Sequence, residues 1–584
     1  MNKIIRTFIA LLLILYTAAL PAFAMETTKM SIELDTMVQN IVDEGKSKGA
    51  VLSIVKDGEI ELCKGYGFAD EYLGHSADGE KTAFRIGSVS KTFVAVAAQI
   101  LSQRELLNMN SDISIYLESD FPKLSYPVTM HQLLTHTAGF EDMVTGIAVY
   151  NVSDTEKLSE SVTKYMPAQV YKPGEVISYS NYGIALAAYV IECVTNQGFA
   201  AFCDEEIFKP LDMNRTTFKH MHDIVYVSKP YLPNGNEAME PYMNLYPEGS
   251  AVSTAENMAK YMLWLLNSDD SRVLSHKAKK EIFQQQFTMS NEFEGIGYIW
   301  NRKSRNDEVF YEKKGETLNF YTRIVLYPQE GSGIFLSFNT YVPEHEINSV
   351  INKATDMLYG EKHEFKLDSV KSSINIKGLY VDNWSSFKTQ EKILRYLIPG
   401  KMVYISGSQA NGYLINGGKM TLIGEDLYST KEGVVKFHEK GNSIFMASDS
   451  AITFVKVPIW QHMIIQILIP STFITVTAVI FFRELFLLLN KNTKKLNRPF
   501  LIISAIQIIS FSIILLIMYK GVITFSLLNL TLPSKICGWV MFSSVIYITV
   551  NTLRRKMLNS FLLQKIWNIS GFLLCTWLFY FNII

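Results

Sequence analysis

The chain has 584 residues, of which 48% are hydrophobic, and its 55 Lys and Arg against 56 Asp and Glu leave a formal net charge of −1. This balance excludes a strongly basic nucleic-acid binder, and the apolar content excludes a disordered polyelectrolyte. The average hides a division: residues 459–584 carry eleven cations and one anion, whereas residues 25–458 carry 42 cations and 55 anions. An acidic body therefore precedes a basic and very apolar C-terminal part.

Residues 1–24 predict a secretory signal peptide. Lys3 and Arg6 form a positive start, residues 8–15 are an unbroken apolar core, and Ala22-Phe23-Ala24 supplies a small-x-small cleavage pattern. An uncleaved N-terminal anchor is the alternative, and with either one the residues that follow are exported.

Helical and strand patterns alternate through residues 25–360, which predicts an α/β sandwich closed by its last strands and helix. Asp57-Gly58 between two strand-like runs predicts a tight hairpin, and Ser253-Thr254-Ala255-Glu256 predicts a capping box. In chain order we expect a helix at 32–44, strands at 50–56 and 59–65, a strand at 84–87 running into a helix to about residue 104, a helix from 253 to about 267, adjacent antiparallel strands at 309–312, 320–327 and 333–339, and a helix at 343–359.

Residues 361–457 change character. Short apolar runs separated by Gly, Asn and Asp predict a small β-rich domain, for which an incomplete barrel is one form. No motif in it carries recognisable chemistry.

The last part, 458–584, contains four apolar stretches long enough to cross a bilayer, at 459–482, 500–519, 536–553 and 566–584. The first and third connections hold five and four Lys or Arg, whereas the middle one holds two. The positive-inside rule therefore places the first and third connections in the cytoplasm and the preceding domain on the outer face of the membrane. The cores of these stretches hold no Asp, Glu or His, which favours an anchor over an ion pathway.

Cysteine and histidine patterns indicate no metal site. The chain has five cysteines and neither a CxxC pair nor an HExxH motif, so no metal or other cofactor is expected. Cys193 and Cys203 could form a disulfide in an oxidising compartment or remain two buried thiols.

The pattern Ser-x-x-Lys, which can supply a nucleophile and its base, begins at Ser53, Ser88, Ser161 and Ser385. Only Ser88 follows a strand and a glycine and opens an apolar helix. Lys91 then lies one helical turn along on the same face, within reach of the Ser88 hydroxyl. A helix N-cap is the structural alternative for Ser88.

Local electrostatics favours Lys91 as a base. The helix N-terminus and a second nearby cation would disfavour its ammonium form and so lower its pKa. The backbone N–H of Ser88 could supply half of an oxyanion hole.

Two further segments add groups of matching chemistry. Tyr179-Ser180-Asn181 precedes an apolar helix; the phenol can relay a proton to a leaving group, and the amide can hold a substrate carbonyl. Lys313-Lys314-Gly315 lies on a late strand beside Glu316, where a cation could hold a substrate carboxylate and backbone N–H groups could complete the oxyanion hole. Each segment alone also fits a packing or solvated role, and their common order favours a site.

Together these segments resemble the serine β-lactamase and penicillin-binding D-peptidase family, in particular its class C β-lactamase-like branch. The resemblance covers about residues 31–360 and implies an α/β (α+β) sandwich of an antiparallel sheet with a helical subdomain. It rests on GSVSKTF at 87–93, LLTHTAGF at 133–140, YSNYG at 179–183 and KKG at 313–315, with support from Gly49, from the segments 56–58 and 65–67, and from Gly249 with 253–255.

The resemblance also implies residue roles. His136, within the second motif, is implied to be structural. The third motif departs from many relatives, which have His-x-Gly there, and Glu316 would repel a substrate carboxylate. The implied roles are acylation of Ser88, acid–base chemistry by Lys91 and Tyr179, substrate binding by Asn181, Lys313 and Gly315, and an oxyanion hole from the backbone N–H groups of Ser88 and Glu316.

The sequence thus predicts a membrane-anchored, extracytoplasmic serine hydrolase that forms an acyl-enzyme. Its substrate would be a small peptide, a β-lactam or an ester, with a D-amino-acid peptidase or β-lactamase-like enzyme favoured; the layout also resembles peptidases that remove a D-amino-acid leader from exported prodrug metabolites. The alternatives are an esterase of the same fold, a β-lactam or wall-fragment sensor acylated without turnover, and a pseudoenzyme that binds wall material. In known sensors of this kind the membrane part precedes the penicillin-binding domain and includes a cytoplasmic zinc protease, whose motif is absent from this sequence. The intact Ser88, Lys91 and Tyr179 argue against the pseudoenzyme.

Overall fold

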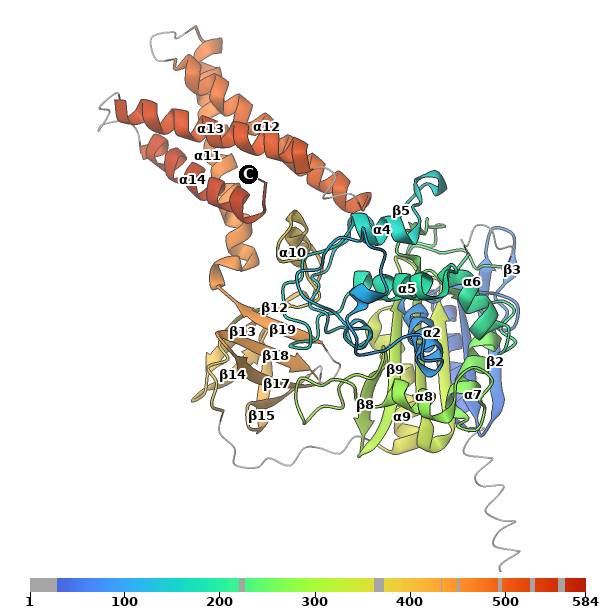
Figure 1. Cartoon of the computed structure of the whole chain (residues 1–584). Helices are drawn as coiled ribbons and strands as arrows, with labels where there is room; N and C mark the ends of the chain where they lie inside the picture. The colour runs from blue at the N-terminus through green and yellow to red at the C-terminus, as the bar shows by residue number, and fades with distance from the viewer. Residues whose placement is uncertain are drawn as a thin grey trace, which may run out of the picture.

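A computed structural model describes residues 29–219, 226–361, 372–431, 433–448, 452–491, 496–525, 531–554 and 562–583. The predicted signal peptide, 1–24, lies outside the described residues. Figure 1 shows a sheet covered by helices, a separate small barrel, and a bundle of long helices that rises from the barrel.

A seven-stranded antiparallel sheet in the order β3-β2-β1-β11-β10-β9-β8 forms the centre of the N-terminal part. The predicted hairpin is confirmed: β1 pairs with β2 through Asp57 (φ 50°) and Gly58 (φ 87°). The three late strands are adjacent and antiparallel, as expected. The strands are β1 Gly49–Lys56, β2 Glu59–Asp70, β3 His75–Ser76, β8 Asn301–Arg305, β9 Glu308–Glu316, β10 Tyr321–Tyr327 and β11 Ser332–Phe338.

Helices cover both faces of this sheet, so every residue of β1 is buried. One face packs against the helical residues 29–43 and against α9 (Glu344–Tyr359). The other packs against the helical layer of α2 (Lys91–Gln103), α5 (Asn181–Thr195) and α7 (Ala255–Leu266). Cys193 on α5 and Cys203 at the end of α6 (Phe199–Cys203) are free thiols.

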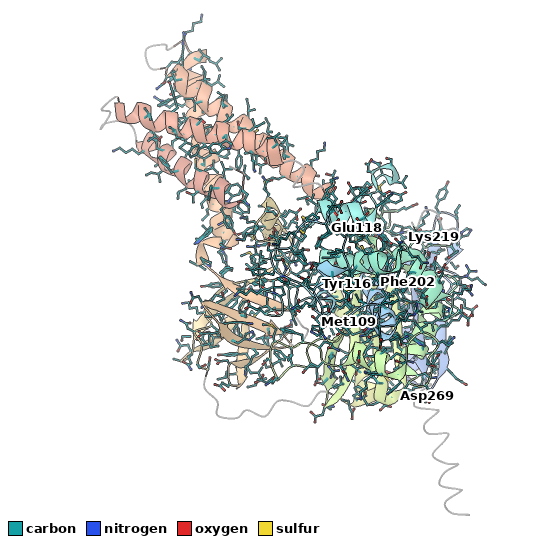
Figure 2. All side chains as sticks on the ribbon, viewed as in Figure 1. Met109, Tyr116, Glu118, Phe202, Lys219 and Asp269 are labelled. Atoms are coloured by element: carbon teal, nitrogen blue, oxygen red, sulfur yellow. The ribbon has the colours of Figure 1, made fainter. Side chains whose placement is uncertain are left out.

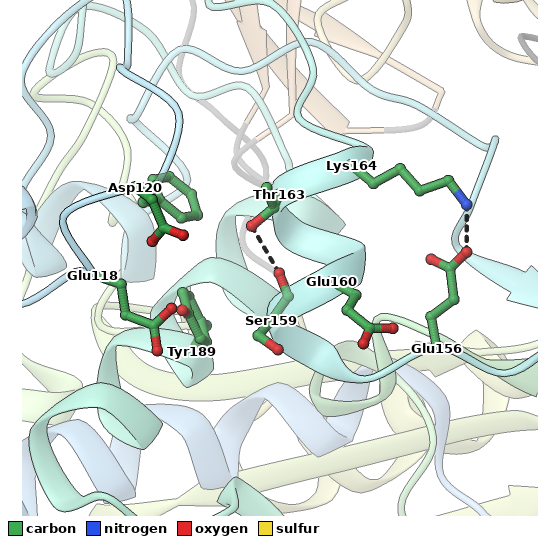
Figure 3. A pocket seen from close by; sticks show the side chains of 9 residues that line it. Glu118, Asp120, Glu156, Ser159, Glu160, Thr163, Lys164 and Tyr189 are labelled. Atoms are coloured by element: carbon green, nitrogen blue, oxygen red, sulfur yellow. Dashed lines mark hydrogen bonds and ion pairs between the residues drawn. The ribbon is translucent and has the colours of Figure 1, made fainter.

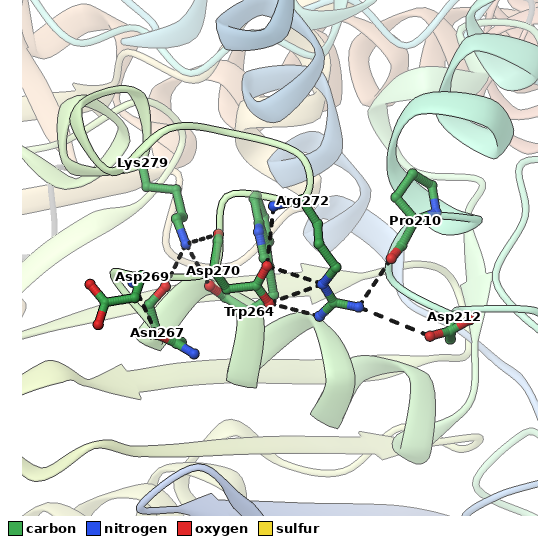
Figure 4. A network of polar contacts seen from close by, with 8 residues as sticks. All are labelled: Pro210, Asp212, Trp264, Asn267, Asp269, Asp270, Arg272 and Lys279. Carbon is green, nitrogen blue, oxygen red and sulfur yellow. Dashed lines mark hydrogen bonds and ion pairs between the residues drawn. The ribbon is translucent and has the colours of Figure 1, made fainter.

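The start of α7 differs from the predicted capping box by one residue. Thr254 is the N-cap, and its side chain accepts from the backbone N–H of Asn257, whereas the Ser253 hydroxyl bonds Thr216. Beyond α7, Lys279 on α8 (His276–Phe283) donates to the carbonyl oxygens of Trp264 (3.1 Å) and Asp270 (2.6 Å), which fixes the connection shown in Figure 4.

The β-rich part is a closed eight-stranded barrel and not an incomplete one, because its first strand pairs with its last. Tyr380, Ile405 and Phe437 are among the side chains that fill its core. Its strands are β12 Gly378–Asp382, β13 Met402–Ser408, β14 Gly412–Ile415, β15 Gly418–Gly424, β16 Leu427–Thr430, β17 Gly433–Lys440, β18 Ser443–Ser448 and β19 Thr453–Val457.

The C-terminal bundle contains α11 (Met463–Leu489), α12 (Arg498–Ile523), α13 (Thr531–Arg554) and α14 (Leu562–Tyr580). Among the described residues, three helices are long and apolar enough to cross a membrane: α11, α12 and residues 532–550 of α13. Many large apolar side chains of these helices are exposed, as expected for contact with lipid; Figure 2 shows side chains extending from the bundle. The helix α14 packs against α11, and the indole of Trp567 donates to Thr477 (3.0 Å).

The helix α11 extends past the predicted first span and so includes Glu484. This carboxylate is fully buried and accepts from the backbone N–H of Asn497 (2.7 Å) at the end of the bundle remote from the barrel.

The connection between β12 and β13 touches the other two parts of the protein. It contains the short helices η8 (Gln390–Ile393) and α10 (Leu394–Leu397). Its contacts are Ser178 Oγ to the Asn383 carbonyl (3.1 Å), the Lys388 N–H to Glu141 (2.7 Å), the Thr145 N–H to Glu391 (2.8 Å) and Gln390 Nε2 to Ser534 Oγ (3.0 Å).

Candidate active site

Ser88 lies where the chain leaves the short strand β4 (Phe84–Arg85) and enters α2. A single 3-10 turn, η1 (Gly87–Ser90), separates the two elements. Neither η1 nor α2 has a side-chain capping bond, so the N-cap alternative for Ser88 does not hold. Ser88 is half-buried and therefore remains accessible to a substrate.

Lys91 and Tyr179 converge on the Ser88 hydroxyl. Lys91 Nζ lies 2.8 Å from Ser88 Oγ, and Tyr179 OH lies 3.0 Å from the same atom. The helix α2 supplies Lys91 one turn after Ser88, whereas Tyr179 comes from the segment that precedes α5. The structure thus brings together the three residues that the motifs single out.

The charge environment of Lys91 differs from the expected one. Its Nζ lies 2.7 Å from Glu248 Oε2 and also contacts the Glu248 carbonyl oxygen. Burial lowers the pKa of the ammonium, but the Glu248 carboxylate and Tyr179 outweigh burial, so the pKa of Lys91 is raised above its ordinary value. The expectation of a lowered pKa was wrong because no motif identified Glu248.

Lys313 is the lysine with the lowered pKa. Burial and the nearby Lys91 cation hold its pKa well below the usual range. Its Nζ lies 5.0 Å from the centroid of the Tyr179 ring, so Lys313 lies beside Tyr179 in the candidate site.

Aromatic rings enclose the Tyr179 side chain. The His136 ring lies 4.2 Å from it and the Trp384 ring 4.9 Å, measured between centroids. Trp384 follows strand β12 of the barrel, so a residue from outside the sandwich contributes to the site. Burial raises the pKa of Tyr179, although Lys91 and the bond to Ser88 oppose the shift.

Asn181 is the first residue of α5, and the Ser180 side chain caps this helix. Among the described residues, the buried Asn181 Oδ1 has no hydrogen-bond partner, so this acceptor is available to a substrate N–H. His136 Nδ1 contacts the backbone N–H of Ser180 (3.3 Å) and thereby supports this turn, in line with a structural role.

Two glycines allow η1 to approach the end of β9. A Cβ on Gly315 would lie 2.0 Å from the Ile86 carbonyl oxygen, and one on Gly87 (φ 51°) would lie 2.7 Å from the Glu316 nitrogen. The backbones at Ser88 and Glu316 therefore run side by side, as a two-donor oxyanion hole requires. The Glu316 carboxylate is exposed and pairs with Arg323 (3.5 Å), which offsets the repulsion expected of it.

The described residues also enclose a cavity of about 480 Å³ that none of the predicted site residues lines. It lies between the segment at 118–121, α4 (Leu158–Lys164) and Tyr189, and Figure 3 shows its four carboxylates. Lys164 and Glu156 form an ion pair at its rim. The described residues contain no group of three or more His, Cys, Asp or Glu that could hold a metal ion.

A half-buried serine bonded by a lysine and a tyrosine, with a strand-end backbone opposite, defines a serine hydrolase of the β-lactamase and penicillin-binding class. The chain belongs to the beta-lactamase family, whose profile matches residues 34–352. The resemblance and the fold class expected from the sequence are therefore confirmed.

Known relatives and solved structures agree with this assignment. Protein flp of Staphylococcus aureus (strain MRSA252) is 28% identical over 366 residues, which is 58% of this chain and 71% of that protein. The putative penicillin-binding protein PbpX of Bacillus subtilis (strain 168) is 27% identical over 258 residues, covering 43% of this chain and 63% of that one.

Two solved structures share the fold. The octameric penicillin-binding protein homologue from Pyrococcus abyssi has a TM-score of 0.50 and 19% identity, covering 73% of this chain and 99% of that chain. SurE has a TM-score of 0.55 and 16% identity, covering 74% and 100%. At these identities the likeness establishes the fold alone.

Proposed function

We propose that the protein is a membrane-anchored, extracytoplasmic serine hydrolase that acts through an acyl-enzyme on an amide or ester, as a D-amino-acid peptidase or β-lactamase-like enzyme. The observation that carries this proposal is the convergence of Lys91 Nζ and Tyr179 OH on Ser88 Oγ. The proposed divisions are a signal peptide at 1–24, a catalytic domain at 25–360, a β-rich domain at 361–457 and a transmembrane region at 458–584.

In this mechanism Ser88 Oγ attacks the substrate carbonyl carbon, and Lys91 and Tyr179 act as its acid–base pair. The backbone N–H groups of Ser88 and Glu316 stabilise the oxyanion. The Asn181 amide orients the acyl part of the substrate, and Lys313 and Gly315 also contact the substrate. Water then hydrolyses the ester through the same groups.

The arrangement of the bundle supports an external catalytic domain. The backbone N–H of Gly146 donates to the Phe525 carbonyl oxygen (3.1 Å), so the end of α12 lies beside the catalytic domain. The Gln390 side chain bonds the carbonyl oxygen of Asn582 (3.2 Å), so the end of α14 lies on that side as well. The helix ends that flank the two most basic connections therefore lie at the remote end, which the positive-inside rule assigns to the cytoplasm.

Turnover by the full-length protein in detergent tests the proposal. The panel is nitrocefin, D-Ala-D-Ala peptides, N-acyl-D-Asn amides and short-chain esters, each compared with Ser88→Ala. We expect turnover of at least one class, abolished by the substitution. Turnover that survives Ser88→Ala would exclude this residue as the nucleophile, and the class that is turned over identifies the substrate.

The contacts of the β12–β13 connection favour a second candidate, a sensor that is acylated without turnover. This connection bonds both the turn before Tyr179, through Ser178, and the bundle, through Ser534. A stable acyl-enzyme with no measurable deacylation would favour the sensor, whereas multiple turnovers would exclude it.

A further inference from the structure

Glu248 is a buried carboxylate at the centre of the site that no motif identifies. It ends the 3-10 turn η6 (Tyr246–Glu248), and its side chain is 6% exposed. Among the described residues it is the ion-pair partner of Lys91, which it contacts through both Oε2 and its own carbonyl oxygen.

The charged and titratable groups around Lys91 come from several elements. Glu248 is the carboxylate among them, and the Arg85 guanidinium from β4 interacts electrostatically with Glu248. Lys313 from β9, Tyr179 before α5 and His136 after α3 (Met130–Leu134) face the same space. Without Glu248, a fully buried ammonium would lack a counter-charge, at high cost.

An ammonium at Lys91 determines where the Ser88 proton goes. Two of its N–H groups point to Glu248, and the third points to Ser88 Oγ, where it occupies a lone pair. Tyr179 OH donates to the same atom (3.0 Å) in the resting site. Once its O–H turns to the leaving group, the phenol oxygen is the neighbouring atom with a lone pair open to the Ser88 proton, since every Lys91 N–H is already engaged.

Resting on the function proposed above, we propose that Glu248 is a positioning residue that keeps Lys91 charged throughout acylation and so routes the Ser88 proton through Tyr179 to the leaving group. The Ser88 Oγ–carbon bond forms as its O–H bond breaks, and that proton moves to the Tyr179 oxygen. The phenolic proton of Tyr179 moves to the leaving nitrogen or oxygen as its bond to the acyl carbon breaks. This narrows the acid–base role given to Lys91 above: Lys91 acts through its charge alone, and it neither gains nor loses a proton.

The test is the pH dependence of Ser88 acylation by a fluorescent penicillin in the full-length protein. Glu248→Gln keeps an oxygen near Lys91 but removes the charge, so the alkaline limb, where Lys91 deprotonates, should move down by at least one pH unit. Glu248→Asp, which keeps the charge, should hold the limb within half a unit of wild type.

Glu192→Gln is the matched control. Glu192 accepts from Tyr246 OH (3.2 Å) and so supports the same turn without contacting Lys91. A merely structural role for Glu248 predicts equal behaviour of the two Gln variants, whereas our proposal predicts a shifted limb only for Glu248→Gln.

The possible results of this experiment distinguish failure of the role proposed for Glu248 from failure of the proposed function. Absence of Ser88 acylation in the wild type at every pH would defeat the proposed function itself. Acylation with an unmoved limb in Glu248→Gln would overturn only the role of Glu248. If Glu248→Gln does not fold, Glu248→Asp decides: a limb kept at the wild-type pH supports the role, and a lowered limb contradicts it.

Discussion

Lys91 and Lys313 lie in one site, but their pKa values shift in opposite directions because the Glu248 carboxylate lies closer to Lys91. Glu248 raises the pKa of Lys91, whereas burial and the Lys91 cation lower the pKa of Lys313. Environment thus gives identical side chains separate tasks, as it does in paired acid–base sites generally. In the role proposed above, Lys91 is a fixed positive charge beside Ser88, and Lys313 is the lysine that more readily becomes a neutral amine.

Tyr179→Phe should lower the rate of Ser88 acylation by about 10²–10⁴-fold, because it removes the group that transfers the proton. Stopped-flow measurement with a fluorogenic ester or a chromogenic β-lactam determines this rate. Tyr171→Phe is the control, since its hydroxyl bonds Asn383 (2.9 Å) and not Ser88. Equal rates for Tyr179→Phe and the wild type would remove Tyr179 from the mechanism.

His136 predicts a dependence of stability on pH. Burial and the Lys313 and Lys91 cations hold the pKa of its imidazole well below 6.5 in the folded state. Below about pH 6.5 the unfolded chain binds a proton that the folded chain does not. The free energy of unfolding therefore decreases as the pH is lowered, by up to ~1.4 kcal/mol per pH unit.

His136→Asn, which suits the local φ of 55°, should remove this dependence. Thermal unfolding of both proteins between pH 7.5 and 5.5 measures it. The wild type should lose about 1 kcal/mol or more relative to the variant by pH 5.5. Parallel curves would show that His136 titrates normally.

Among single residues of the site, the sequence predicted those that lie in motifs and gave no signal for the others. Ser88 and Lys91 are linked by helical spacing, which is local, and the structure places Tyr179 beside them. Glu248 and Trp384 come from turns distant in sequence, where nothing in the local pattern marks them, so only the fold reveals their contacts.

The approach of η1 to β9 depends on the absence of a side chain at two positions. A Cβ at Gly315 would meet backbone that cannot move aside without separating Ser88 from Glu316. The oxyanion hole that we propose therefore depends on how these two elements pack.

Gly315→Ala should cost ~1–3 kcal/mol of stability and should slow acylation by about 10²-fold or more, because it separates the two donors. Gly198→Ala is the control: its added Cβ would lie 3.9 Å from the nearest atom, Glu192 Oε1. Thermal unfolding and labelling rates measure both effects. Unchanged acylation in Gly315→Ala would exclude Glu316 as a donor.

Elements were predicted well where the pattern was local. The hairpin at Asp57, the three late strands and α9 follow from turn residues and periodicity. The cap of α7 was misplaced by one residue because Ser253 and Thr254 can both cap. Closure of the barrel depends on pairing between β12 and β19, which sequence periodicity does not encode.

Over the whole molecule, the connection between β12 and β13 couples the catalytic domain, the barrel and the bundle. Trp384 reaches Tyr179 from this connection, and Gln390 reaches α13. The outward apolar surface of the bundle and the division of charge between the two parts of the chain both fit an anchor beneath an external domain.

Cysteine labelling of intact bacterial cells tests this topology. Tyr72→Cys, at a position that is 92% exposed in the catalytic domain, should react with a membrane-impermeant maleimide. Lys491→Cys, beyond the remote end of α11, should react only after the membrane is permeabilised, and the wild-type chain gives the background. The reverse pattern would place the catalytic domain inside the cell.

The proposed function depends on covalent acylation of Ser88. Mass spectrometry of the full-length protein after incubation with a β-lactam or an activated ester measures this directly. We predict one adduct per chain, located on the peptide that contains Ser88 and absent from Ser88→Ala. An adduct that persists in Ser88→Ala, or that maps to another residue, would contradict the proposed role of Ser88.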